Sequence, residues 1–323
     1  MIPRSNRIVW YFASGYFLCY AFYSALIKQA TSGPTELPGL TLLPSVTLGT
    51  AITLPLIVTL LGWWSTSPRF DRDTLIAGAA TGAIILTTTL AYTFDGVSIV
   101  FTLLLLRGGV LVLAPIVDRI CGRDVRWFCW AAFVASMAAL VIALSHLRDT
   151  KMTAIAALNT CAYLACYAIR LPRMTRCAKV AEQDPTRGWF LGEMTVALAF
   201  QFLLPLVAAL LPGTAGAQLR SGFTGISTIG VGVGVLYGCL YFFGTSVYLD
   251  RRENTFCVPL NRGASLLAGI VATIAIGTAP TPPELAAASL VVAALLFLSP
   301  VHHLPETFFA RMRGAMRKKE LLP

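Results

Sequence analysis

Ten long apolar segments constrain the fold of this chain more than any other feature of its sequence. An apolar segment of about 18 or more residues can cross the ~30 Å hydrocarbon core of a bilayer as a helix. Only 12% of the 323 residues are charged and 56% are hydrophobic, which is too little charge for the surface of a soluble domain. The sequence therefore predicts an all-α integral membrane protein with ten transmembrane helices, at residues 8–29, 41–62, 74–94, 97–117, 126–146, 153–171, 188–211, 224–248, 254–276 and 284–300.

The positions of the positive charges predict how these helices are oriented. With the N-terminus in the cytoplasm, the cytoplasmic segments hold 19 of the 25 Lys and Arg residues, Arg170 and Lys179 among them. The opposite side holds four: Lys28, Arg148, Lys151 and Arg220. Cytoplasmic loops of membrane proteins carry an excess of Lys and Arg. We therefore expect both termini in the cytoplasm. The net charge of +10 then reflects this topology in the lipid bilayer of a bacterial inner (plasma) membrane, and we expect no binding of nucleic acid.

Two internal matches indicate that the chain consists of two related halves. Residues 15–21 (GYFLCYA) resemble residues 162–168 (AYLACYA) at an offset of 147. Residues 94–109 resemble residues 249–264 at an offset of 155. These matches pair the first predicted helix with the sixth and the fourth with the ninth, and an odd repeat unit of five helices inverts the second copy. We predict a first five-helix repeat at residues 1–151, an inverted second repeat with a basic tail at residues 152–323, and a substrate site near the midplane between them.

Arg107 and Arg262 are the strongest candidates for that site. Both fall near the middle of a predicted helix, and the second match pairs them with each other. An ionisable residue in a membrane span costs at least ~2.5–3.5 kcal/mol and usually faces a cavity or a partner. A guanidinium group stays charged and its planar fork fits phosphate or carboxylate. We expect the two arginines to bind an anionic group, with phosphate the best match; the alternative is that each pairs with a buried acid or helix carbonyls and holds the bundle together.

Four tyrosines form a second symmetric set. Tyr16 and Tyr20 are four residues apart and share one helix face, and Tyr163 and Tyr167 repeat this spacing in the second half. A tyrosine inside a bundle offers ring surface and a hydroxyl group to a polar ligand. We expect these side chains to contact the substrate, with ordinary packing between helices as the alternative.

Three acidic residues complete the candidate site. Glu193 lies in the seventh predicted helix, where it can pair with Arg262, carry a coupling proton or stabilise the N-terminus of its helix. Asp95 and Asp250 lie at helix junctions and are expected to cap a helix or act as gates. The cysteines and histidines do not show the spacing of a zinc site, and the chain contains no H-E-x-x-H, G-x-S-x-G or phosphate-binding loop. We therefore expect no catalytic residue, no metal and no cofactor.

The end of each half resembles a known family of carriers. Residues 97–144 look like the end of an EamA unit, with a short basic turn (CGRDVR, residues 121–126), then Trp127 and an Ala-rich span, and Pro282-Pro283-Glu284 stands at the equivalent turn of the second half. With ten spans and the inverted repeat, the chain resembles the drug/metabolite transporter superfamily, the EamA-like carriers. EamA units commonly carry a proline early in the fourth helix, whereas this chain has Arg107-Gly108-Gly109 there. Within that superfamily, phosphate-ester translocators hold phosphate with basic residues in central helices, and Arg107 and Arg262 look similar in kind.

Three functions follow from these features. The first is a secondary transporter that moves a small organic anion by alternating access. The second is a flippase or carrier for a phosphate-bearing lipid or a polyprenyl-phosphate-linked substrate. The third is a membrane-embedded transferase, which needs acidic metal ligands clustered at one face, whereas Asp95 and Asp250 are expected on opposite faces. We expect a transporter and not an enzyme, and association into a homodimer is left open.

Overall fold

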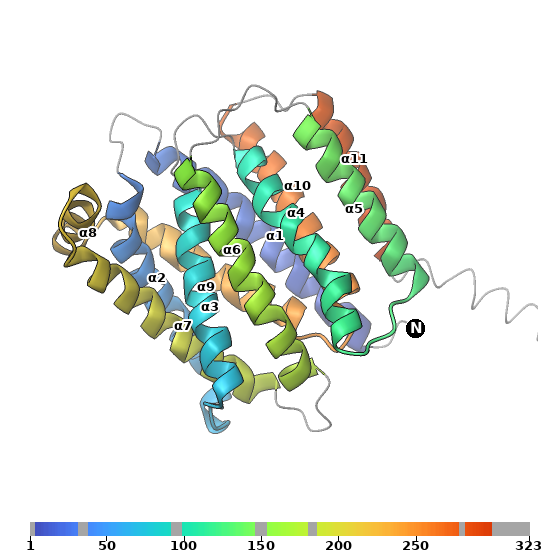
Figure 1. Cartoon of the computed structure of the whole chain (residues 1–323), viewed down its shortest axis with the longest axis horizontal. Coiled ribbons are helices and arrows are strands. Elements are labelled where there is room, and N and C mark those ends of the chain that lie inside the picture. The colour runs from blue at the N-terminus through green and yellow to red at the C-terminus, as the bar shows by residue number, and fades with distance from the viewer. Residues whose placement is uncertain are drawn as a thin grey trace, which may run out of the picture.

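Helices form all of the regular secondary structure in the part of the chain that the structure describes. The computed structural model describes residues 4–31, 38–91, 99–145, 154–179, 186–277 and 282–298. The predicted site residue Asp95 and the basic C-terminal tail lie outside these ranges. The helices run in the order α1 (Arg4–Thr31), α2 (Gly39–Leu60), α3 (Arg72–Ala91), α4 (Ile99–Ile120), α5 (Trp127–Ser145), α6 (Ala154–Met174), α7 (Thr186–Ala209), α8 (Thr214–Thr224), α9 (Thr228–Tyr248), α10 (Asn254–Ala275) and α11 (Pro282–Leu298) (Figure 1).

Six of these helices are long and apolar enough to cross a membrane, which indicates an integral membrane protein. They are α2, α3, α7, α9, α10 and the helix at Ala154–Lys179, which joins α6 to a π-helical turn at Thr175–Lys179. The other four predicted spans coincide with α1, α4, α5 and α11. That these four also cross the membrane stays a prediction.

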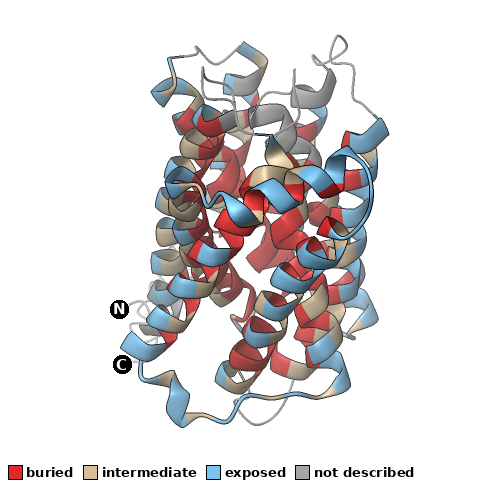
Figure 2. Ribbon diagram, turned by 90° about the vertical axis from the view of Figure 1, so that its left-hand side faces the viewer, coloured by how far each residue is buried: buried red, intermediate tan, exposed pale blue. Residues whose placement is uncertain are grey.

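The helices contact one another in a regular pattern. The most extensive contacts join α1 and α2 to α9, α6 and α7 to α3, and α5 to α11. Further contacts join α1 to α10, α4 to α10 and α6 to α4. Buried residues line the inward faces of these helices and exposed residues cover their outer faces (Figure 2). The centre of the bundle is therefore enclosed by α1, α3, α4, α6, α9 and α10.

A short helix lies where the sequence predicts only a connection. Residues 212–223 separate two predicted spans, yet most of them form α8, which packs on α2 and α7. Gly213 has a φ of 103°, a conformation that glycine adopts without strain and that turns the chain sharply after α7. The Arg220 side chain donates hydrogen bonds to the carbonyl oxygens of Ala209 (2.5 Å) and Leu211 (3.3 Å). These bonds satisfy acceptors that the C-terminal end of α7 leaves free.

Two glycines allow α2 and α9 to touch backbone to backbone. A Cβ atom added at Gly234 would lie 2.2 Å from the carbonyl oxygen of Val46 and 2.9 Å from the Cα of Gly49. We expect Gly234→Ala to lower the free energy of unfolding by about 1–3 kcal/mol, the usual result of overpacking. Gly232→Ala on the same helix is the matched control, because its nearest neighbour would be a Leu26 methyl group 3.7 Å away. Thermal unfolding in detergent checks this pair, and equal melting temperatures for the two variants would rule out the close contact.

Candidate functional site

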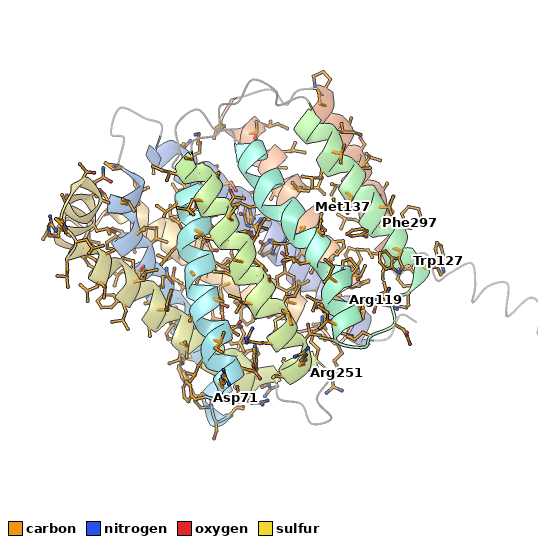
Figure 3. All side chains as sticks on the ribbon, in the orientation of Figure 1. Asp71, Arg119, Trp127, Met137, Arg251 and Phe297 are labelled. Carbon is orange, nitrogen blue, oxygen red and sulfur yellow. The ribbon has the colours of Figure 1, made fainter. Side chains whose placement is uncertain are left out.

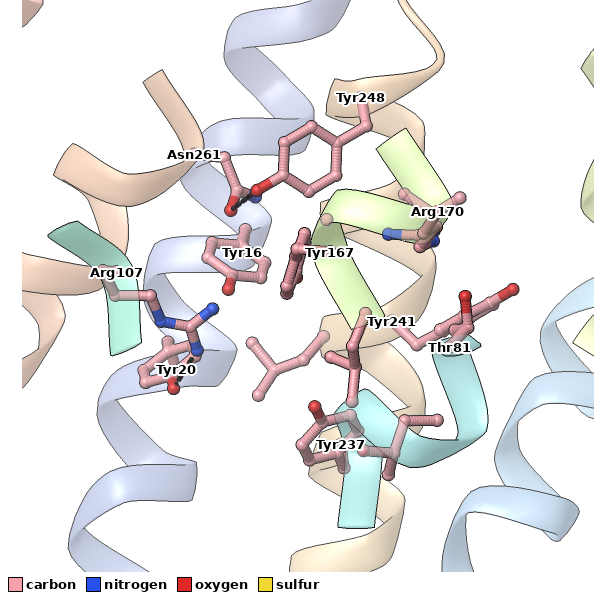
Figure 4. Close-up of a pocket in the computed structure, with 15 residues that line it drawn as sticks. Tyr16, Tyr20, Thr81, Arg107, Tyr167, Arg170, Tyr237, Tyr241, Tyr248 and Asn261 are labelled. Carbon is pink, nitrogen blue, oxygen red and sulfur yellow. Dashed lines mark hydrogen bonds between the residues drawn. The ribbon is translucent and has the colours of Figure 1, made fainter. Parts of the chain in front are cut away.

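A pocket lined by tyrosines and arginines lies at the centre of the bundle. It is a small cavity, with a volume of about 40 Å³. Side chains from α1, α3, α4, α6, α9 and α10 converge on it (Figure 4). The lining residues are Tyr16, Tyr20, Thr81, Ile84, Ile85, Arg107, Tyr167, Arg170, Tyr237, Leu240, Tyr241, Gly244, Thr245, Tyr248 and Asn261. The pocket thus contains one of the two predicted arginines and three of the four predicted tyrosines.

Arg107 on α4 contacts tyrosines from both halves of the chain. Its side chain is 2% exposed. One Nη atom donates a hydrogen bond to the hydroxyl oxygen of Tyr163 (2.9 Å), and the other donates to that of Tyr20. The guanidinium carbon also lies 4.9 Å from the centroid of the Tyr20 ring, within the range of a cation–π interaction. Tyr20, Tyr163 and Arg107, which the sequence predicts to share a site, are in contact.

Arg262 on α10 is buried without a hydrogen-bond partner. Its side chain is 0% exposed, and none of its three guanidinium nitrogens has a hydrogen-bond partner among the described residues. The guanidinium carbon lies 4.8 Å from the ring centroid of Tyr167 and 5.5 Å from that of Tyr248. Arg262 does not line the pocket itself, but both of these rings do. A buried charged donor with no hydrogen-bond partner is a rare and costly arrangement, so Arg262 remains a candidate for binding an anionic group.

The two arginines have corresponding partners. The offset of 155 pairs Arg107 with Arg262, and the separate offset of 147 pairs Tyr20 with Tyr167. Each arginine lies over the corresponding tyrosine ring, at 4.9 Å in the first half and 4.8 Å in the second. The halves differ in hydrogen bonding, because Arg107 donates to two tyrosine hydroxyl groups and Arg262 donates to none among the described residues.

Arg170 is the second arginine that lines the pocket, and its predicted place among the cations of the cytoplasmic segments is wrong. The sixth span was predicted to end at residue 171, whereas α6 continues to Met174 and a π-helical turn extends to Lys179. This longer helix keeps Arg170 inside the bundle, where it is 3% exposed, and it buries Lys179, whose Nζ lies 3.1 Å from Oδ1 of Asn254. The spacing could have revealed Arg170, because it follows Tyr167 by three residues and so shares its helix face.

Glu193 on α7 pairs with Arg170. Its two carboxylate oxygens accept hydrogen bonds of 2.6 and 3.1 Å from Nε and one Nη of Arg170. The Thr81 hydroxyl donates to the same carboxylate at 2.9 Å and the Tyr241 hydroxyl at 3.3 Å. Arg170 donates a further bond of 3.0 Å to the Thr245 hydroxyl. The counter-charge role predicted for Glu193 therefore has Arg170 as its partner, and not Arg262.

The charges of the connecting segments gather at one end of the bundle. Asp71, Arg119, Trp127 and Arg251 all lie toward this end (Figure 3). Asp250, in the turn between α9 and α10, is paired with Arg252 at 2.7 and 2.9 Å. Burial alone would raise the pKa of Asp250, but the hydrogen bonds and charge of Arg252 outweigh it and hold the pKa below its ordinary value of 3.8.

The N-terminus of α10 is capped by Asp118 from α4. This buried carboxylate accepts hydrogen bonds from the backbone N–H groups of Asn254 (2.9 Å) and Thr255 (2.7 Å) and from the side chains of both residues. Asp250, predicted as a cap or gate, bonds instead to the backbone N–H of Arg252. The sequence does not predict the capping role of Asp118, because this residue directly follows the predicted end of the fourth span, where a charge is typical of a loop. Among the described residues, no group of three or more His, Cys, Asp and Glu side chains could hold a metal ion.

Comparison with known proteins supports the fold and goes no further. No protein-family description matches the chain, and no curated protein matches it. A solved structure described as "Crystal structure of protein" is similar to it, with a TM-score of 0.58 and 16% sequence identity. The match covers 92% of this chain and 98% of that chain. This likeness shows that an experimentally known fold extends over almost the whole chain.

Proposed function

We propose that this protein is a secondary transporter that moves a small, phosphate-bearing organic anion across the membrane by alternating access. One observation carries the proposal: the fully buried Arg262 guanidinium, whose three nitrogens have no hydrogen-bond partner among the described residues. Cation–π contacts with Tyr167 and Tyr248 offset only part of the cost of burying this charge without a hydrogen bond. A bound anion that accepts hydrogen bonds from this guanidinium group would remove the remaining cost. An arginine with a purely structural role would instead have a permanent hydrogen-bond partner in the protein.

The charges around the pocket favour a ligand with more than one negative charge. Arg107, Arg170 and Arg262 are buried in this region together with one carboxylate, Glu193. These described side chains leave a formal surplus of about two positive charges among largely buried groups, where a net charge is costly. A phosphate monoester carries about −1.5 to −2 at neutral pH, so it matches the surplus. The tyrosine rings around the arginines offer surface to the organic part of such a ligand.

The helix contacts support an inverted repeat of five helices. Exchanging α1 with α6, α2 with α7, α3 with α9, α4 with α10 and α5 with α11 maps each extensive contact either onto another one or, for α4 with α10 and α5 with α11, onto itself. The contact of α1 with α9, for example, becomes that of α6 with α3. Inverted repeats place the substrate site where the halves meet and permit alternating access by rocking of one half against the other. Ten membrane spans, cytoplasmic termini, membership of the EamA-like carriers and a bacterial inner membrane belong to the same proposal.

Transport into proteoliposomes tests this function against its alternative. The full chain is reconstituted and offered inorganic phosphate, phosphate monoesters and dicarboxylates, while fluorescent phospholipids in the same membranes report lipid scrambling. We expect uptake of at least one phosphate-bearing solute, and its loss in Arg107→Met and Arg262→Met. Scrambling without solute uptake would favour a carrier of phosphate-bearing lipids. Correctly folded variants that both transport at the wild-type rate would exclude the arginine site.

A further inference from the structure

We propose that Arg170 and Glu193 form a proton-linked anion subsite within the pocket. Arg170 binds either the Glu193 carboxylate or an anionic group of the ligand, and Glu193 takes up a proton when the ligand replaces it. This inference rests on the proposed anion transport and adds the coupling ion. Protons would then move together with the anion, so that a proton gradient drives its uptake.

The geometry places Glu193 and a ligand in competition for the same guanidinium group. Arg170 lines the pocket, whereas Glu193 lies behind it and does not. Nε and one Nη of Arg170 hold the two carboxylate oxygens side by side, as the planar fork also holds two oxygens of a phosphate or carboxylate ligand. An anion that enters the pocket can thus reach the Arg170 guanidinium and compete with Glu193 for it. When it takes over these hydrogen bonds, Glu193 loses its charged partner.

The second half of the chain carries this ion pair, and the first half does not. Four buried positions of α1 correspond at the offset of 147 to four buried positions of α6: Tyr16, Tyr20, Tyr23 and Ile27 on α1, and Tyr163, Tyr167, Arg170 and Met174 on α6. Arg170 therefore corresponds to Tyr23, a neutral side chain that is equally buried. Since a tyrosine fills this place in one half, packing of the repeat does not require a charge there. The ion pair is a departure from the repeat, which indicates a role in function.

Protonation is the step that compensates the loss of the partner. Among the described residues, the charged or titratable groups within hydrogen-bond distance of Glu193 are Arg170 from α6 and Tyr241 from α9, and Thr81 from α3 adds a neutral hydroxyl. A carboxylate left in this place without Arg170 is far costlier to bury than the neutral acid. The proton comes from water and adds to one carboxylate oxygen. Its O–H group can then donate to the hydroxyl oxygen of Thr81 or Tyr241, and no other bond changes apart from hydrogen bonds.

Calorimetry on the purified full chain tests this subsite. Sulfate is the first probe, because it carries two negative charges and does not titrate near neutral pH; inorganic phosphate is the second. Titrations in buffers of different ionisation enthalpy count the protons that bind with the anion. We expect uptake of about one proton per anion and an apparent dissociation constant that rises up to about tenfold per pH unit while free Glu193 is ionised. In Glu193→Gln, the proton uptake and the pH dependence should both disappear.

The double variant Arg170→Gln/Glu193→Gln guards against a folding defect, because it leaves no unpaired charge. It should bind the anion more weakly, through Arg107 and Arg262, and without proton uptake. Anion binding by the wild-type protein without proton uptake, or uptake that persists in either variant, would overturn the subsite while leaving the proposed transport intact. Failure of the wild-type protein to bind either anion would contradict the proposed function itself, and the subsite with it.

Discussion

The Arg262→Met variant is expected to lose anion binding and yet to be at least as stable as the wild-type protein. A methionine side chain adapts to the shape of the space that the arginine fills. Replacing buried charged groups with apolar residues of similar volume is often neutral or stabilising by about 1–4 kcal/mol, and Arg262 has no hydrogen bond to lose. The ligand, by contrast, loses a buried charged partner, which weakens binding by at least about 100-fold, or about 2.7 kcal/mol.

Thermal unfolding and phosphate or sulfate binding, measured on the same preparations, check this combination. Arg252→Met is the matched control, because Arg252 is hydrogen-bonded to Asp250 outside the pocket. We expect the control to bind the anion like the wild-type protein. If Arg262→Met unfolded at a much lower temperature, Arg262 would have a structural role in the bundle. That result would contradict the proposed anion site at Arg262.

The second large effect is expected at Asp118. Replacing Asp118 with leucine keeps the size of the side chain but leaves the N–H groups of Asn254 and Thr255 without their acceptor. Each buried group left unsatisfied costs about 1–3 kcal/mol. We expect the free energy of unfolding to fall by about 3 kcal/mol or more, since two backbone donors and two side-chain donors lose one charged acceptor.

Asp118→Asn provides the comparison, because its amide oxygen can still accept from part of this set. We expect it to lose less than half as much stability as Asp118→Leu in denaturant or thermal unfolding. Similar losses for the two variants would mean that charge, and not hydrogen bonding to α10, is what Asp118 contributes.

Hydropathy locates the helices of this chain because each long helix in the bundle carries a nearly continuous apolar sequence. The repeat in turn pairs Arg107 with Arg262 and Tyr20 with Tyr167, and the structure places each arginine over its tyrosine ring. Each pairing falls within a longer sequence match that has a single offset, 155 for the arginines and 147 for the tyrosines. Both pairings can therefore be recognised from the sequence.

Residues near the ends of spans could not be assigned in this way. Arg170 and Asp118 stand where hydropathy falls, and a charge there is typical of a loop. Their burial depends on the continuation of α6 through a π-helical turn and on the approach of α10 to the end of α4. For Asp118 this is a tertiary feature with no local signal, whereas the three-residue spacing of Arg170 from Tyr167 is a local signal for Arg170. Glu193 gives an indirect signal for a buried arginine, because a carboxylate in an apolar helix needs a cationic partner. The sequence alone does not identify Arg170 as that partner.

An experimental structure with a bound anion tests the central claim most directly. The full chain in lipid nanodiscs would be imaged with the phosphate-bearing solute that binds it best. We predict that the anionic oxygens lie within hydrogen-bond distance of the Arg262 guanidinium and of Arg107, between the rings of Tyr20 and Tyr167. A ligand bound elsewhere, with Arg262 hydrogen-bonded to protein groups in its presence, would contradict the proposed site.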